Sequence, residues 1–192
     1  DSVQKILEIE AQWVVGFGGE LEVVMKARRD TEFPQLPRFG LRLFLPKEFD
    51  RVSYCGLGPE ENYEDKCRAA SYGLYKSSVM DLHEAYLRPQ ENGSRQGCDY
   101  VMAEGCVRKL GAVSAKPFGF NASVYTQEEL TEKTHNYELT PCGSTVLCLD
   151  YRQNGIGSAS CGPDLLERYR LLEEEFTFDM KLIPMGRESI QK

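Results

Sequence analysis

The chain has 192 residues, 41% of them hydrophobic, and a formal net charge of −7. This length is enough for one domain with an ordinary apolar core, and the composition is not that of a disordered or collagen-like chain. The densest basic cluster is Lys26, Arg28 and Arg29. Acidic residues outweigh it, so we do not expect nucleic-acid binding. No run of about 18 apolar residues occurs, so we expect no membrane contact.

Cysteine usage indicates free thiols and no metal. The seven cysteines are odd in number, and none lies in a Cys-x-x-Cys pair. Zinc sites normally contain such close pairs, and only two histidines could add further ligands. We therefore expect no metal or cofactor in this chain, and a reducing, cytoplasmic compartment. Because the chain begins at Asp1 without a methionine, we interpret it as a segment of a longer protein.

Alternation of apolar and polar residues predicts β-strands along the chain. Residues 7–15 and 21–27 flank a glycine-rich turn and predict a hairpin. On the first strand the odd positions, Trp13 among them, form an apolar face that we expect to lie in the core. The other predicted strands are 39–45, 52–56, 118–124, 145–151 and 176–182.

Helical signals are few. Thr126 and Glu129 fit the start of a short helix, His135 is expected to cap its C-terminal end, and 164–168 predicts another single turn. Strands that do not alternate with helices favour an all-β antiparallel sandwich, here with one domain over 1–192. Two long irregular stretches, 56–75 and 83–97, are candidates for functional loops.

The first motif is GLGPEENYED at 56–65. It follows a strand, as a phosphate-binding loop does, but its acidic residues would repel phosphate. We predict a tight turn in which Asn62 and Asp65 bond to nearby backbone.

The second motif is RPQENGSR at 88–95. It combines an Asn92-Gly93 turn with charges of both signs. Glu91 could pair with Arg88 or Arg95 and lock the loop, or it could bond to a sugar hydroxyl. We favour the loop lock over the sugar contact.

The third motif is LDYRQNGIGSASCGP at 149–163. Its small residues would let a ligand or a neighbouring domain approach closely. A wide surface turn is an equally good interpretation.

No catalytic residue can be assigned from these patterns. Glycoside hydrolysis needs two carboxyl groups about 5–5.5 Å apart for retention, or about 6.5–9.5 Å for inversion. The candidates Glu60, Glu61, Asp65 and Glu91 are close only in sequence. The chain also has no Gly-x-Ser-x-Gly nucleophile motif.

Taken together, the motifs resemble one enzyme family. The three motifs occur in the order and spacing of the small-chain domain of glycoside hydrolase family 2 β-galactosidases, as do LPRFG at 36–40 and FGFNASVYTQEEL at 118–130 followed by His135. The resemblance implies a large β-sandwich similar to galactose mutarotases, of which this chain lacks the first part. It also implies a parent enzyme that hydrolyses terminal β-D-galactosides such as lactose with retention.

The resemblance places both catalytic glutamates in a TIM barrel outside this chain, so the chain alone is expected to be inactive. Its loops would help to close the substrate pocket and contact the other domains of the parent. Any Mg²⁺ and Na⁺ would bind elsewhere in the full-length enzyme.

The candidate site residues come from the same motifs. Pocket-lining candidates are Glu91, Asn92, Arg95, Ser160 and Cys161. Residues expected to shape the loops are Gly58, Pro59, Asn62, Tyr63, Asp65, Gly155 and Gly157. Cys161 occupies the position at which the best-known family members carry a sugar-stacking Trp, and a thiol provides no aromatic platform.

Two other functions remain open from the sequence. One is a free-standing carbohydrate-binding or mutarotase-like module, although mutarotation needs a general acid and base and histidines are scarce. The other is an immunoglobulin-like interaction module, although the expected Cys…Trp…Cys spacing is absent. Exposed apolar edges would favour pairing, so a homo-oligomer is a further expectation.

Overall fold

The computed structural model of the chain describes residues 4–157 and 163–186. Within them the strands are β1 (Leu7–Val15), β2 (Leu21–Arg29), β3 (Arg38–Pro46), β4 (Arg51–Gly58), β5 (Ser71–Ser78), β6 (Arg95–Glu104), β7 (Lys109–Ser123), β8 (Ser144–Gln153) and β9 (Glu175–Met185). The helical segments are η1 (Met80–Leu82), α1 (Gln127–Glu132), η2 (Asn136–Glu138) and η3 (Glu167–Tyr169). None of these helices is long and apolar enough to span a lipid bilayer.

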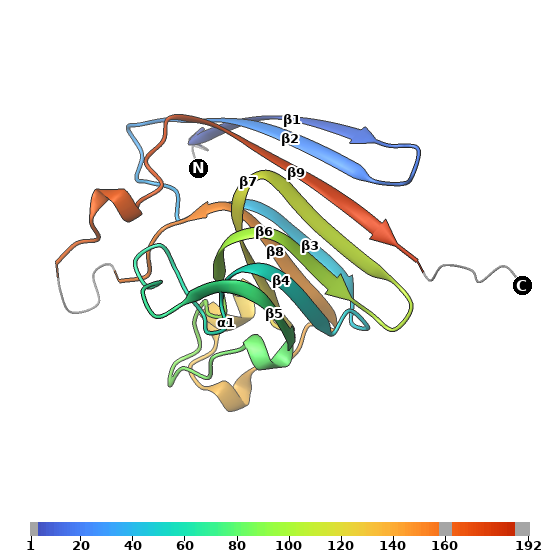
Figure 1. Cartoon of the computed structure of the whole chain (residues 1–192). Helices are drawn as coiled ribbons and strands as arrows, with labels where there is room; N and C mark the ends of the chain where they lie inside the picture. Colours follow the sequence, from blue (N-terminus) through green and yellow to red (C-terminus); the bar gives the residue numbers. More distant parts are fainter. Residues whose placement is uncertain (1–3, 158–162, 187–192) are drawn as a thin grey trace, which may run out of the picture.

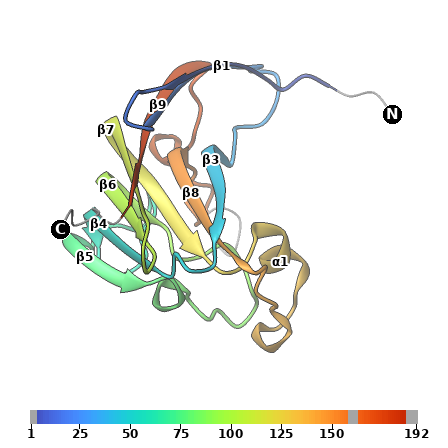
Figure 2. The same cartoon turned by 90° about the vertical axis from the view of Figure 1, so that its right-hand side faces the viewer.

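The strands form one strongly bent antiparallel sheet, in the order β1-β2-β9-β7-β6-β4-β5, with β8 joining β7 to β3. The sheet bends so that β1, β2 and β9 form a layer above β3 and β8 (Figures 1 and 2). This two-layered arrangement is an all-β sandwich and confirms the predicted fold class.

β7 is the strand at which the sheet divides. Its first part, 109–113, pairs with β9, whereas its last part, 119–123, pairs with β8. Asp179 of β9 lies where the two strands separate, and its Oδ2 accepts hydrogen bonds from the Ser114 hydroxyl and the Ala115 amide. These bonds satisfy donors that the sheet ladder leaves free at this point.

Aromatic side chains fill the space between the layers. Phe176 of β9 packs edge-on against Phe39 of β3, with ring centroids 4.8 Å apart, and stacks on Tyr151 of β8 at 4.7 Å. β2 contributes Val23 and Met25 to the same core. Aromatic pairs of this geometry add to the stabilisation that comes from burial alone.

The seven predicted strands are confirmed, but two more were missed. β5 occupies part of the stretch expected to be irregular, and β6 begins at Arg95 inside the other. Their sequences, SYGLYKSS and RQGCDYVMAE, lack the alternation that marks a strand with one wet face. Neighbouring strands supply the backbone bonds that their local pattern does not predict.

Three local predictions were wrong. Trp13 is 51% exposed, because β1 is an edge strand that no layer formed by the described residues covers. His135 is the N-cap of η2 and does not end α1, whose C-cap is Lys133. The turn expected at 164–168 forms slightly later, as η3. The predicted Thr126 N-cap is confirmed, since its hydroxyl accepts from the Glu129 amide.

Candidate functional site

The three motif loops lie together at one end of the sandwich. Residues 59–70 connect β4 to β5, residues 83–94 connect η1 to β6, and the third loop follows β8. They extend to the lower left of the strands in Figure 1. Two contacts between the loops show this directly: the Asn62 amide donates to the Ser94 carbonyl, and Asp65 binds the amide of Ile156.

The strongest of these interactions involves Arg38, the first residue of β3. Its Nε and Nη2 donate to the two carboxylate oxygens of Asp150 on β8, both at 2.6 Å. Its Nη1 donates to Oε1 of Glu91 at 3.0 Å. The Asp150 side chain is only 2% exposed. A bidentate pair with so little solvent fixes both orientation and distance, so Arg38 ties the second motif to the third.

Burial shifts the pKa values of the two carboxylates that bind Arg38, Asp150 and Glu91. It raises the pKa of Asp150, and Arg38 opposes that rise. Burial also raises the pKa of Glu91, Arg38 lowers it, and the neighbouring Asp150 carboxylate adds to the rise. Two carboxylates thus share one guanidinium in a region of low polarity, where an unpaired charge is costly.

Glu61 joins the first motif to the second. One oxygen of its carboxylate accepts from Lys66 at 2.7 Å and from the Tyr86 hydroxyl, and the other accepts from the Gly93 amide at 2.8 Å. Burial acts to raise the pKa of Glu61, but the bonds from Lys66, Tyr86 and Gly93 outweigh it and hold the pKa below its usual value. Glu61 is therefore an ionised structural anchor.

The turn at Pro59 is held by two buried side chains. Asn62 donates to the carbonyls of Leu57 and Glu60 and accepts from the Gln96 amide. Arg95, 2% exposed, donates to the carbonyls of Pro59 and Gly93. Backbone oxygens that would otherwise lack partners are thereby satisfied. The Gly58–Pro59 peptide is cis.

Asp65 reaches across to the third motif. Its two oxygens accept from the amides of Ile156 and Gly157, at 3.0 and 2.8 Å. A Cβ on Gly155 would lie 2.5 Å from Cγ of Asp65, and one on Gly157 would lie 2.9 Å from Oδ2. The two glycines are therefore required for close approach and not for backbone conformation.

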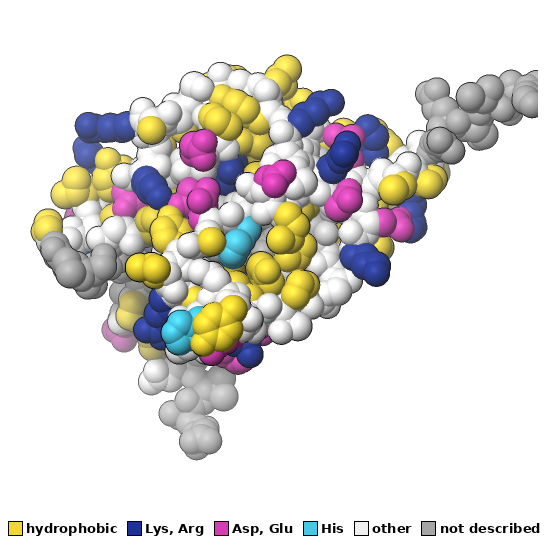
Figure 3. Space-filling view, turned by 90° about the horizontal axis from the view of Figure 1, so that it is seen from below, with side chains coloured by type: hydrophobic (Ala, Val, Ile, Leu, Met, Phe, Trp, Pro, Cys, Tyr) yellow, Lys and Arg dark blue, Asp and Glu magenta, His cyan; other side chains and the backbone are white. Residues whose placement is uncertain are grey.

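A cavity of about 530 Å³ opens beside these loops. It is lined by residues of the first two motif loops, including Glu61, Asp65, Lys66, Glu84 and Tyr86. The view from below shows acidic, basic, histidine and apolar side chains interspersed on this side of the molecule (Figure 3). Such a mixed polar and aromatic lining can bond to hydroxyl groups. Among the described residues, no cluster of His, Cys, Asp and Glu has the geometry of a metal site.

Comparison with known proteins identifies the family. The sequence profile described as "Beta galactosidase small chain" matches residues 1–182. The chain belongs to the β-galactosidase small-chain family. A β-galactosidase from Actinobacillus pleuropneumoniae is 46% identical over 179 residues, which are 93% of this chain and 17% of that protein. One from Staphylococcus xylosus is 42% identical over 186 residues, 95% of this chain and 19% of that protein.

A third small-chain relative is the β-galactosidase of Arthrobacter sp. (strain B7). It is 33% identical over 188 residues, 91% of this chain and 18% of that protein. The chain thus spans about a fifth of the length of these relatives. Each relative as a whole is a β-galactosidase, so the match assigns this chain to a component of such enzymes.

The ion pair predicted at 88–95, between Glu91 and Arg88 or Arg95, was wrong, because neither arginine is the partner of Glu91 among the described residues. Glu91 binds Arg38, and Arg95 binds backbone carbonyls. Arg38 enters from a distant strand, so spacing along the loop could not identify it. Asn92 is buried and accepts from the Glu84 amide. Pocket-lining roles for Glu91, Asn92 and Arg95 stay predictions, and Ser160 and Cys161 lie outside the described residues.

Most residues expected to shape the loops lie in the three motif loops, which together form the loop cluster. Asn62 bonds to nearby backbone as expected, whereas Asp65 bonds to a loop 91 residues away in sequence. A Cβ on Gly58 would lie 2.4 Å from the Tyr54 hydroxyl oxygen. Tyr63 is 1% exposed and its hydroxyl has no partner among the described residues. Burial raises the pKa of Tyr63.

Sequence reasoning missed four residues that organise the loops: Arg38, Lys66, Tyr86 and Asp150. Arg38 and Asp150 were visible only as members of the resembling motifs at 36–40 and 149–163. Asp150 is a charged residue within the otherwise apolar predicted strand 145–151. That position was a usable signal, because a charge that is buried with such a strand needs a partner.

Proposed function

We propose that this chain is an accessory segment of a β-galactosidase that hydrolyses terminal β-D-galactosides such as lactose with retention. Its loop cluster helps to close the substrate pocket and contacts the rest of the enzyme. One observation carries the proposal. Three motifs, far apart in sequence, are joined by the Arg38 ion pairs and by carboxylate–amide hydrogen bonds, in a chain that matches only about a fifth of each β-galactosidase relative.

The carboxylates of the loop cluster support a structural role over a catalytic one. A retaining mechanism needs one carboxylate free to attack and one carboxylic acid free to give a proton. Asp65 is occupied by two backbone amides, Glu61 by Lys66, Tyr86 and Gly93, and Asp150 by Arg38. We therefore place the catalytic glutamate pair, and any Mg²⁺ and Na⁺, in the remaining domains of the parent enzyme.

The cavity beside Tyr86 supports a role near substrate. Its lining combines an aromatic ring with carboxylate and ammonium groups, which suits a sugar. The buried bonds behind it hold those groups in place, and a fixed geometry is what a pocket wall must provide.

A chimeric enzyme tests the proposal. This chain replaces the matching 17% of the A. pleuropneumoniae β-galactosidase, and hydrolysis of a chromogenic β-galactoside is measured. The chimera should be active, and the same enzyme without the segment inactive. The chain alone, purified from a host without its own β-galactosidase, should show no turnover. Turnover by the chain alone would refute the accessory role.

Galactose titration of the chain separates the remaining alternative. Saturable binding at low millimolar concentration, followed by tyrosine and Trp13 fluorescence, would favour a free-standing carbohydrate-binding or mutarotase-like module. An accessory segment, which holds only part of the pocket, should give no saturation in that range.

A further inference from the structure

The cavity of about 530 Å³ beside the first two motif loops contains charged side chains that the fold does not use. Glu60, Arg68 and Glu84 line it, and among the described residues none of these three side chains has a hydrogen-bond or ion-pair partner. Glu60 and Arg68 are exposed, and Glu84 is partly buried. A charged group that the fold leaves without a partner is available to a ligand.

The backbone of both glutamates is anchored, although their carboxylates are not. The Glu84 amide donates to Oδ1 of Asn92 at 2.9 Å, and the Glu84 carbonyl accepts from the Tyr86 amide at 2.9 Å. The Glu60 carbonyl accepts from the side-chain amide of Asn62 at 3.0 Å. An anchored main chain with an unbound carboxylate presents a negative charge at a defined place on the cavity wall.

Other charges on the cavity wall are fixed by partners. Glu61 binds Lys66 at 2.7 Å and also the Tyr86 hydroxyl. Lys66 lies over the Tyr86 ring, 5.9 Å from its centroid. Both oxygens of Asp65 accept from backbone amides. The wall thus has a rigid part, in which charges and an aromatic ring are locked together, and a second part whose charges can meet a ligand.

The cavity wall as a whole carries an excess of negative charge. Among the described residues, its lining contains four carboxylates and two basic side chains, which are Glu60, Glu61, Asp65, Glu84, Lys66 and Arg68. Such a wall attracts cations and repels anions over about one Debye length, which is about 8 Å at physiological ionic strength. The cavity therefore discriminates between ligands by their charge.

The part of a galactoside that meets the cavity follows from the proposed function. A retaining hydrolase brackets the glycosidic bond with its two catalytic carboxyl groups, and the proposed function assigns both to domains outside this chain. Those domains hold the terminal galactosyl unit, so loops that close the pocket from outside meet the leaving group. The galactosyl unit is uncharged and common to all the substrates, so a charged wall distinguishes them by the leaving group.

We propose that this cavity selects galactosides by the charge of the leaving group. Glu60 and Glu84 favour neutral or cationic leaving groups over anionic ones, and Arg68 acts in the opposite direction. All three are specificity-determining residues and take no part in bond cleavage. The inference rests on the proposed function, since it requires a galactoside beside the loop cluster. Each residue acts through its charge, which a neutral side chain of similar shape removes.

Substrates matched in size but not in charge test the selection in the chimera with the A. pleuropneumoniae enzyme. The 4-nitrophenyl, 4-carboxyphenyl and 4-(aminomethyl)phenyl β-D-galactosides have neutral, anionic and cationic leaving groups. Their intrinsic reactivities differ, so the readout is the anionic-to-neutral ratio of kcat/KM in each variant, divided by that of the wild type. Glu84→Gln and Glu60→Gln should each raise this ratio about two- to fivefold, and lower the cationic-to-neutral ratio by a similar factor.

Arg68→Gln is the variant of opposite sign. It should lower the anionic-to-neutral ratio, because it removes a positive charge from the same cavity. A disturbance of shape alone has no reason to change direction with the sign of the charge that is removed. Raising the salt concentration to about 1 M shortens the Debye length to about 3 Å, and should bring the ratios of all the variants close to that of the wild type.

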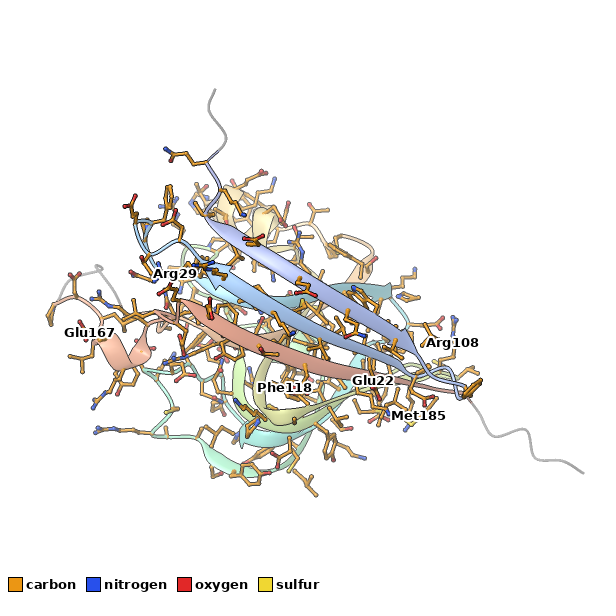
Figure 4. The ribbon with its side chains drawn as sticks, turned by 90° about the horizontal axis from the view of Figure 1, so that it is seen from above. Glu22, Arg29, Arg108, Phe118, Glu167 and Met185 are labelled. Atoms are coloured by element: carbon orange, nitrogen blue, oxygen red, sulfur yellow. The ribbon has the colours of Figure 1, made fainter. Side chains whose placement is uncertain are left out.

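Glu10→Gln is the matched control. It removes one carboxylate from an exposed position on β1, on the side of the molecule opposite the loop cluster. In Figure 4, seen from above, β1 and the neighbouring β2, whose ends are marked by Glu22 and Arg29, face the viewer. The motif loops lie below the strands in Figure 1. A charge that far from the cavity is screened, so the ratios should stay at their wild-type values.

The outcomes distinguish the two proposals. Each chimera variant should unfold at the wild-type temperature, because the substitution removes no partner that the described fold uses. A folded, active chimera whose ratios are the same in all variants would overturn the charge selection and keep the proposed function. Ratios that shift in the same direction for Glu84→Gln and Arg68→Gln would also overturn it. A folded chimera that does not hydrolyse galactosides would contradict both proposals.

Discussion

The guanidinium of Arg38 holds both carboxylate oxygens of Asp150, each at 2.6 Å, across the neighbouring strands β3 and β8. The pair is almost fully enclosed on the Asp150 side, and Arg38 also binds Glu91 from the second motif loop. One arginine therefore aligns a strand and two loops. The consequences of removing it, and of disturbing the other loop contacts, can be measured on the isolated chain.

Replacing Arg38 should strongly destabilise the fold. Arg38→Met leaves the buried Asp150 and the half-buried Glu91 without a cation, and removing one partner of a buried pair typically costs about 3–5 kcal/mol. Arg108→Met is the matched control, because Arg108 pairs with Glu48 at the surface with 62% of its side chain exposed. That change should cost about 0–1 kcal/mol. Urea denaturation measures both, and equal losses would contradict the role given to Arg38.

Gly155→Ala should push the third loop away from the first. The new Cβ would meet Cγ of Asp65 at 2.5 Å and Cδ1 of Leu165 at 2.8 Å, and overpacking of this kind costs about 1–3 kcal/mol. Gly186→Ala, with open space around its Cβ, is the control and should be nearly neutral. If Asp65 is the obstacle, Gly155→Ala should cost less in an Asp65→Ala background. An unchanged cost in that double-mutant cycle would point to Leu165 alone.

Glu61 should stabilise the fold in a pH-dependent way. Its pKa is lowered in the folded chain, where the bonds from Lys66, Tyr86 and Gly93 outweigh burial. Its contribution is therefore complete above the unfolded pKa of about 4.3 and is lost as pH falls through the folded value. At pH 7, Glu61→Gln should cost about 1.5–3 kcal/mol.

The difference in unfolding free energy between wild type and Glu61→Gln should become smaller as the pH is lowered below about 4.3. Glu8→Gln provides the control, because Glu8 pairs with Lys5 on an open surface and should matter less. Urea denaturation at pH 7, 5 and 3 gives the comparison. A difference in unfolding free energy that stays constant with pH would show that the charge of Glu61 does not contribute to stability.

The pKa of His83 in the folded chain should lie below the ordinary value for histidine. Burial lowers the pKa of His83, and its ring packs on Tyr125 with centroids 5.2 Å apart. The unfolded chain binds the proton more readily, so stability should decrease as pH falls below about 6.5 towards the folded value. The chain has only two histidines, and His135→Asn assigns their NMR signals. A His83 midpoint at or above about 6.5 would contradict the prediction.

The sequence alone determined the strand-rich fold class, most strand positions and the family. Period-two alternation is a local property, so β2, β3 and β9 could be located from their own residues. The short α1 was also predictable, because an N-cap needs only Thr126 and Glu129. The family resemblance depended on several motifs in a fixed order, which the sequence displays directly.

Only the tertiary structure decided which residues face one another. Arg38 and Asp150 are 112 residues apart, and Asp65 and Ile156 are 91 apart. Such pairs form where strands and loops from distant parts of the chain lie side by side. The spacing of residues along the sequence does not predict which distant segments become neighbours. The exposure of Trp13 was decided in the same way. Alternation showed that β1 has an apolar face, but burial depends on whether another layer lies over it, and β1 is at the edge of the sheet.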